Sequence, residues 1–216
     1  RSVILSGLYN PHNGQYGHQH AYPHFSSFDT VRSLPVLLSQ AGYRTARIGK
    51  YHVAPDHVYP FDTVLQGNDR NAVQMADACR PFLAEPDNKP FFLYFCTSDP
   101  HRGGGKATDL LYQPDRFGNR EQGYPGVAEA KYDSKDVVVP DFLPDTPECR
   151  AELAQYCQAV SRIDQGIGRL VEHLKNAGQY EDTVVIYISD NGIAFPGAKT
   201  TVYEPGINLP CLVRTP

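Results

Sequence analysis

Length, composition and charge limit the classes of protein to which this chain can belong. The sequence has 216 residues, of which 41% are hydrophobic and 20% charged, values typical of a globular domain with a substantial core. The formal net charge of −4 argues against a nucleic-acid-binding protein, because such proteins usually present a basic face. No apolar run approaches the roughly 20 residues of a transmembrane helix, so we expect no membrane span.

The first residues resemble the middle of a longer chain rather than its start. Arg1 stands where an initiator Met would, so we expect a fragment whose targeting signal would lie upstream. The five cysteines are scattered and include no C-x-x-C pair, which gives no indication of a zinc site or a redox dithiol. Four of them lie in apolar patterns and are expected to be buried thiols: Cys79, Cys96, Cys157 and Cys211.

Hydrophobic periodicity predicts helices and strands in alternation. In chain order, we expect a helix over 31–41, a strand over 44–49, a helix over 71–84, a strand over 90–96, one or two helices over 146–178, and strands over 183–188 and 209–213. This order predicts an α/β fold in one domain, with a mostly parallel central sheet and helices on both faces. Residues 103–145 are rich in Gly, Pro, Asp and Tyr and are expected to form a long ordered excursion.

The most informative segment is 183–192, TVVIYISDNG. Its β-branched apolar run predicts a strand buried on both faces, and ligands in open α/β sheets bind beyond the carboxyl ends of such strands. Asp190 and Asn191 stand at that end, and their side chains carry the oxygen ligands that Ca²⁺ or Mg²⁺ takes. Taken alone, a plain Asn-Gly turn is the simpler interpretation.

Polar side chains also follow two other predicted strands, and a lysine lies in the loop after residue 191. These residues are Lys50, His52, Asp99, His101, Arg102 and Lys199. Because the carboxyl ends of parallel strands lie along one edge of the sheet, we expect the residues to converge on one site. The set suits an anionic group held between a divalent cation and Lys or Arg, with histidines moving protons. Phosphate esters and sulfate esters both fit.

Four blocks of the sequence resemble, in order, blocks of the sulfatase family. Residues 1–7, RSVILSG, resemble the second half of the signature Cys-x-Pro-Ser-Arg followed by a short helix and Ser/Thr-Gly. Residues 48–52 resemble the Gly-Lys-x-His block, residues 99–101 the substrate-histidine block, and residues 189–192 with Lys199 the block that binds metal and sulfate. The resemblance implies an alkaline-phosphatase-like fold and a formylglycine-dependent sulfatase.

The resemblance implies a role for each matching side chain. In the family the signature Cys is oxidised to formylglycine, whose hydrated form attacks the sulfur. By position, Arg1 would hold the formylglycine hydroxyl, and Lys50 and Lys199 would bind the sulfate. His101 would protonate the leaving oxygen or nitrogen, and His52 would deprotonate the remaining hydroxyl so that sulfate is eliminated.

The resemblance also implies one Ca²⁺ site, to which Asp190 and Asn191 would contribute. The signature Cys and an upstream Asp pair would lie before Arg1, and the smaller C-terminal subdomain would follow the last residue. Residues 1–216 are therefore expected to be the central part of the catalytic domain, to form the Ca²⁺ site only in part and to be inactive alone.

A finer similarity is to the N-sulfoglucosamine sulfohydrolase branch of the family. It rests on residues 13–17, 24–29, 58–62, 99–102 and 189–196. It implies a sulfated saccharide substrate, with N-sulfoglucosamine of heparan-type glycans as the specific case. His20 and His24 are candidate sugar contacts, while Asp99 and Arg102 could either contact substrate or form structural salt bridges.

The resemblance further implies a formylglycine-generating enzyme as a partner and a periplasmic, secreted or lysosomal location. The sequence gives no indication of oligomeric state. Two alternatives remain open. The first is a phosphate or phosphonate hydrolase of the same superfamily, which would use transition-metal ligands and usually a Thr or Ser nucleophile. The second is a non-catalytic binder of sulfated glycans that keeps the pocket without the nucleophile.

Overall fold

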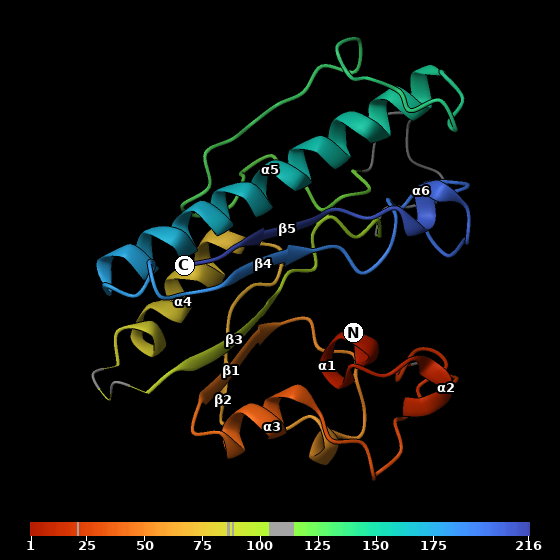
Figure 1. The fold of residues 1–216 in the computed structure, drawn as a ribbon. Helices are drawn as coiled ribbons and strands as arrows, with labels where there is room; N and C mark the ends of the chain where they lie inside the picture. The colour runs from red at the N-terminus through yellow and green to blue at the C-terminus, as the bar shows by residue number, and fades with distance from the viewer. Residues whose placement is uncertain (21, 86, 88, 104–114) are drawn as a thin grey trace. The chain divides into compact units, whose positions relative to one another are not determined.

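The computed structural model describes residues 1–20, 22–85, 87, 89–103 and 115–216 (Figure 1). The chain folds into two compact units. The first consists of Arg1–Gly67 with Ala84–Cys96, and the second of Asn68–Leu83 with Thr97–Pro216. Within the described ranges, every helix is too short or too polar to cross a bilayer.

The first unit is built on a parallel sheet, as the sequence predicts. Its strands lie in the order β2 (Thr63–Leu65), β1 (Arg44–Gly49), β3 (Phe91–Cys96). Strand β3 (FFLYFC) consists mostly of aromatic and branched residues, which pack well on a pleated surface, and β1 (RTARIG) buries Thr45, Ala46 and Ile48. The register sets Gly49 opposite Cys96, so the carboxyl ends of β1 and β3 lie side by side.

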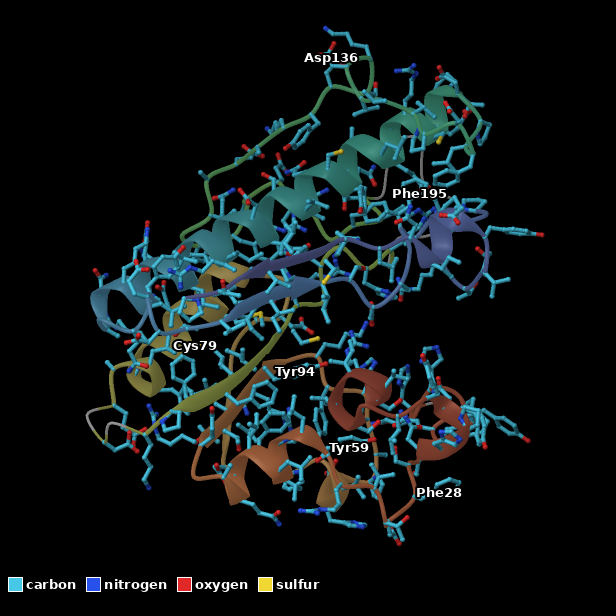
Figure 2. The ribbon with its side chains drawn as sticks, in the orientation of Figure 1. Phe28, Tyr59, Cys79, Tyr94, Asp136 and Phe195 are labelled. Carbon is cyan, nitrogen blue, oxygen red and sulfur yellow. The ribbon has the colours of Figure 1, made fainter. Side chains whose placement is uncertain are left out.

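The first unit also contains short helices. They are α1 (Ser2–Ser6), α2 (Asn10–Asn13), α3 (Leu34–Gln40) and the 3₁₀ helix η1 (Asp56–Val58), of which α3 packs against β1. Helix α3 begins later than the expected 31–41, because Pro35 is tolerated only in a first turn. The core of the unit is a cluster around Leu5, Val53 and the fully buried Tyr59, whose hydroxyl lies 2.6 Å from that of Ser27 (Figure 2).

Three helices and a strand pair form the regular part of the second unit. They are α4 (Ala72–Leu83), α5 (Pro147–Asn176), β4 (Val185–Ile188), α6 (Glu204–Ile207) and β5 (Cys211–Arg214). Helix α5 is one helix of 30 residues that begins at the N-cap Thr146, whose hydroxyl accepts a hydrogen bond from the Cys149 backbone N–H. Helix α4 packs against α5 (Figure 1).

The excursion before α5 contributes to the core of the second unit. Residues 115–146 contain no helix or strand, and residues 104–114 of the expected excursion lie outside the described residues. Phe117 is fully buried in a cluster with Leu143, Leu153 and Phe195 (Figure 2). The Phe117 and Phe195 rings stack with centroids 5.8 Å apart. The excursion is therefore fixed to α5 and to the loop after β4 by apolar packing.

The strand over 183–188 differs from its expected burial. Strands β4 and β5 pair antiparallel with each other, and Ile186 and Leu212 are 61% and 66% exposed. The described strands give β4 a single neighbour, so its apolar residues are not enclosed on both faces as predicted. Cys211, at the start of β5, is exposed for the same reason, contrary to its prediction as a buried thiol, whereas Cys79 in α4 is fully buried as expected.

We predict that Gly166→Ala lowers the free energy of unfolding by about 1–3 kcal/mol, because overpacking a close helix contact forces backbone shifts. A Cβ on Gly166 of α5 would lie 2.3 Å from the Cβ of Ala72 in α4. The matched control is Gly168→Ala in the same helix, where a Cβ meets nothing within 4 Å. That control should raise the free energy of unfolding by up to about 1 kcal/mol, because Ala has a higher helix propensity than Gly. Denaturant unfolding measures both, and equal effects would contradict the close-contact argument.

Candidate functional site

In the first unit, the predicted site residues lie at the carboxyl ends of β1 and β3. Lys50 follows β1 directly, and its backbone N–H donates to the Cys96 carbonyl oxygen at 2.7 Å. The Arg1 side chain lies at the same edge, because its Nε donates to Cys96 Sγ at 3.4 Å. His52 comes two residues after Lys50. The structure therefore brings Arg1, Lys50 and His52 to one edge of the parallel sheet.

His52 is held in an uncommon conformation beside other histidines. Its φ is +52°, in the left-handed region that a non-glycine residue adopts only when its surroundings enforce it. Gln15 Nε2 donates to the His52 carbonyl oxygen at 3.3 Å. The His20 ring packs on His52 with centroids 4.3 Å apart, and His18 packs on His20 at 5.0 Å. His24, the other candidate sugar contact, is exposed with a φ of +44°.

The surroundings of His52 keep its imidazole neutral. Burial and the positive charge of Lys50, followed by His20, Arg1 and His18, lower the pKa of His52 from 6.5 to about 4. A neutral imidazole can accept a proton, so His52 is a candidate base over a wide pH range.

In the second unit, Asp99 is buried between two arginines. The carboxylate is 5% exposed, and its Oδ1 and Oδ2 accept from Arg70 Nη1 and Arg162 Nε, each at 2.8 Å. Burial raises the pKa of the Asp99 carboxyl, and the two guanidinium groups oppose that change. Both arginines also donate to the Phe117 carbonyl oxygen. Because both Asp99 oxygens are engaged by arginine, this geometry favours the structural salt bridge over a substrate contact.

Arg70 and Arg162 are functional candidates that the sequence analysis did not single out. Arg162 is 4% exposed, and it lies on α5 among the buried Ala159, Ile163 and Gly166. Its signal in the sequence was an arginine within the apolar face of a helix, a position that a charged side chain occupies only when it is paired. Arg70 precedes α4 in an ordinary polar segment and gave no comparable signal.

The same network fixes the backbone of His101. The His101 N–H donates to the Ser98 carbonyl oxygen at 2.8 Å, and Arg70 Nη2 donates to the His101 carbonyl oxygen at 3.1 Å. The exposed His101 ring points its Nδ1 to within 3.3 Å of Lys199 Nζ. Because an ammonium group can only donate, Nδ1 is the acceptor and the proton of the neutral ring is on Nε2. His101 therefore presents an N–H donor on the side away from Lys199.

Arg102 is fixed by α5. Its Nε and Nη2 donate to the two carboxylate oxygens of Glu152, both at 2.7 Å, in the parallel two-bond geometry that arginine forms with a carboxylate. The Glu152 carboxylate raises the pKa of Arg102, which remains a cation. Glu152 was not identified from the sequence. Arg102, Glu152 and Lys199 line a pocket of about 600 Å³ within the second unit.

The segment after β4 forms a compact turn. Ser189 Oγ donates to the Asn191 carbonyl oxygen at 2.7 Å, and Asn191 Nδ2 donates to the Gly192 carbonyl oxygen at 2.8 Å. A Cβ on Gly192 would lie 2.1 Å from the Pro205 carbonyl oxygen, so the close approach of α6 requires glycine there. Asp190, two residues beyond the end of β4, is exposed.

Asp190 and Asn191 do not complete a metal site with the other described residues. Their side chains offer oxygen ligands of the type that Ca²⁺ takes, but Ca²⁺ is held by about six to eight oxygens. Among the described residues, no group of three or more His, Cys, Asp or Glu side chains is placed to hold an ion.

Comparisons with known proteins agree with the resemblance in the sequence. The whole chain, residues 1–216, matches the family model described as Sulfatase. The chain is 46% identical over 227 residues to human N-sulphoglucosamine sulphohydrolase, covering 100% of this chain and 45% of that protein. It is 22% identical over 306 residues to an N-acetylglucosamine-6-O-sulfatase from Bacteroides thetaiotaomicron, covering 100% of this chain and 54% of that protein.

The fold is also similar to solved structures. A Bacteroides thetaiotaomicron structure concerned with glycosaminoglycan metabolism aligns with a TM-score of 0.68 at 21% identity, over 100% of this chain and 54% of that chain. The phosphonate monoester hydrolase of Agrobacterium radiobacter aligns with a TM-score of 0.63 at 16% identity, over 99% of this chain and 57% of that chain. The alkaline-phosphatase-like α/β fold is confirmed, and the chain spans about half the length of these relatives.

We predict that Asp99→Asn lowers the free energy of unfolding by about 3–5 kcal/mol, because it leaves two arginines without their counter-charge. Arg162 is nearly fully buried, so water cannot replace the lost carboxylate there. The matched control is Asp145→Asn, which removes the surface partner of Arg150 and should change stability little. Thermal and denaturant unfolding measure both variants, and similar small losses would show that Asp99 is not essential to the packing.

We predict that NMR titration of the His52 ring gives a pKa near 4. The unfolded chain takes up this proton near pH 6.5, so His52 lowers stability as the pH falls from about 6.5 to about 4. Lys50→Met should raise the pKa of His52, since it removes a nearby positive charge, while the exposed Lys89→Met serves as the control. A His52 pKa near 6.5 in the folded protein would contradict the prediction.

Proposed function

Because the chain belongs to the sulfatase family, we propose that it is part of a hydrolase that releases sulfate from a sulfated saccharide, with N-sulfoglucosamine of heparan-type glycans as substrate. The observation that carries this proposal is the 46% identity, over the whole chain, to human N-sulphoglucosamine sulphohydrolase. The similarity to a phosphonate monoester hydrolase, at 16% identity, concerns the fold alone.

Two groups of the proposed chemistry would be supplied beyond the residues described here. In this proposal formylglycine is the nucleophile, formed by a formylglycine-generating enzyme from a cysteine that precedes Arg1. None of the five cysteines of this chain stands in the Cys-x-Pro-Ser-Arg context. Asp190 and Asn191 would provide part of the oxygen ligands of one Ca²⁺ ion. The corresponding location is periplasmic, secreted or lysosomal, as the family suggests.

The proposed acid is His101. Cleavage of the S–N or S–O bond leaves negative charge on the departing nitrogen or oxygen, and a proton donor at that atom lowers the barrier. The contact between Lys199 Nζ and His101 Nδ1 supports this role, since it orients the ring with its N–H at Nε2 and lets Lys199 pass a proton to Nδ1 as Nε2 gives its own to the departing atom. Arg70 supports it too, because its hydrogen bond to the His101 carbonyl oxygen fixes the backbone.

The proposed base is His52, with Lys50 as a cation for the sulfate oxygens and Arg1 as the residue that would hold the formylglycine hydroxyl. The lowered pKa of His52 supports the assignment, because an imidazole that is neutral above about pH 4 is ready to accept a proton. Lys50, whose charge is the first of those that lower this pKa, is also proposed to bind sulfate. Lys199 would contribute a further positive charge, and fixed cations stabilise the charge of the transition state without reorganising.

We expect the full protein that carries this chain, expressed together with a formylglycine-generating enzyme, to release sulfate from N-sulfoglucosamine. Lys50→Ala, His52→Ala and His101→Ala should each lower kcat/KM by about 100-fold or more, because each removes a charge or proton-transfer group. The exposed His57→Ala, which lies outside the proposed site, is the control. Ion chromatography of released sulfate measures the rates.

The same experiment tests the non-catalytic alternative. Mass spectrometry must first establish that formylglycine is present in the purified protein. If the modified protein then releases no sulfate from N- or O-sulfated sugars, the hydrolase proposal is wrong. If the three variants keep the wild-type rate, the assigned roles are wrong even though the activity is real.

A further inference from the structure

The pocket of about 600 Å³ in the second unit is not explained by the roles proposed for sulfate cleavage. It is lined by Arg102, the N-terminal part of α5 with Glu148 and Glu152, and the loop after β4 with Phe195, Pro196 and Lys199. Its size is within the usual range for a small-molecule site and exceeds what a sulfate group needs. Lys199 lies 3.3 Å from His101, so the pocket adjoins the proposed acid.

The charges around this pocket are balanced. Two cations, Arg102 and Lys199, and two carboxylates, Glu148 and Glu152, line it. Arg102 and Glu152 neutralise each other through two hydrogen bonds of 2.7 Å. A balanced wall does not select an anion or a cation. It offers fixed donors and acceptors at once, which suits hydroxyl groups, because each hydroxyl can donate and accept.

The pocket also has an apolar wall that is rigid. Phe195 is 7% exposed and is held by stacking on the fully buried Phe117. Pro196 follows it, and Leu143 from the excursion lines the same pocket. A saccharide ring has apolar C–H faces and polar edges, so a pocket with one apolar wall and one hydrogen-bonding wall is complementary to it.

We propose that this pocket binds the hydroxyl-bearing ring of the saccharide that leaves after desulfation, and that Glu152 is a positioning residue that holds Arg102 toward that ring. The inference rests on the proposed sulfatase function, since it places the ring beside the acid that protonates the leaving atom. Arg102 contacts the sugar. Glu152 acts through Arg102, because its two oxygens fix the guanidinium plane that a flexible side chain would otherwise not keep.

The test is equilibrium binding to the full protein expressed without formylglycine-generating activity, so that ligand is bound and not consumed. Calorimetry measures the Kd of N-sulfoglucosamine, which has the ring, and of inorganic sulfate, which has none. Glu152→Gln and Arg102→Lys should each raise the Kd of N-sulfoglucosamine by about 5- to 20-fold and the Kd of inorganic sulfate by less than 2-fold. The exposed Glu121→Gln should leave both constants unchanged.

A double variant separates positioning from direct contact. If Glu152 acts through Arg102, the double variant Glu152→Gln with Arg102→Lys should raise the Kd of N-sulfoglucosamine no more than the single variant with the larger effect does. Effects that multiply would mean two independent contacts and would overturn the positioning role. Circular dichroism of each variant checks that it is folded, and the partly exposed Glu152 makes loss of folding unexpected.

The outcomes distinguish this inference from the proposed function. If the two variants bind sulfate and N-sulfoglucosamine equally more weakly, or bind both as well as the wild type does, the pocket assignment is wrong even if the modified protein is an active sulfatase. Failure of the wild type to bind N-sulfoglucosamine overturns it as well. The expected binding pattern in a protein that releases no sulfate after formylglycine formation supports the pocket and overturns the hydrolase proposal alone.

Discussion

The buried ion pairs of Asp99 are the interaction on which the second unit depends. One carboxylate joins Arg70, which precedes α4, to Arg162 of α5, and both arginines reach the Phe117 carbonyl oxygen in the excursion. Four segments distant in sequence are thereby fixed by one group. A buried ion pair contributes little net stability compared with apolar packing, but losing one partner leaves an uncompensated charge. The network therefore enforces one arrangement more than it adds free energy.

That arrangement determines where the neighbouring polar side chains lie. Residues 99–102 run from the buried Asp99 carboxylate to the exposed His101 and Arg102, so these four residues connect the core to the pocket. Arg70 holds the backbone of His101, and Glu152 of α5 holds the guanidinium of Arg102. Because α5 supplies both Arg162 and Glu152, one long helix fixes the base of this loop and its outer end. A site supported by a helix keeps its geometry better than one supported by loops.

The sequence predicted the parts of the fold that follow from local patterns. The strand over 44–49 has its expected bounds, and Lys50 and His52 lie just beyond it at the edge of a parallel sheet. Burial of β4 was predicted wrongly, because a β-branched run does not specify how many neighbours a strand has. The supporting residues Arg70 and Glu152 could not be identified, since their partners lie 29 and 50 residues away and only folding brings them together.

The two histidines with proposed proton-transfer roles illustrate why residue type alone could not assign them. His52 and His101 have the same side chain, but their surroundings differ. Around His52, burial and positive charge disfavour the imidazolium, which leaves a neutral ring that accepts a proton. At His101, the Lys199 ammonium donates to Nδ1, so the proton of the neutral ring is on Nε2. The environments, rather than the residue type, distinguish the proposed base from the proposed acid. Lysine has a part in both settings, through charge at His52 and through a directed hydrogen bond at His101.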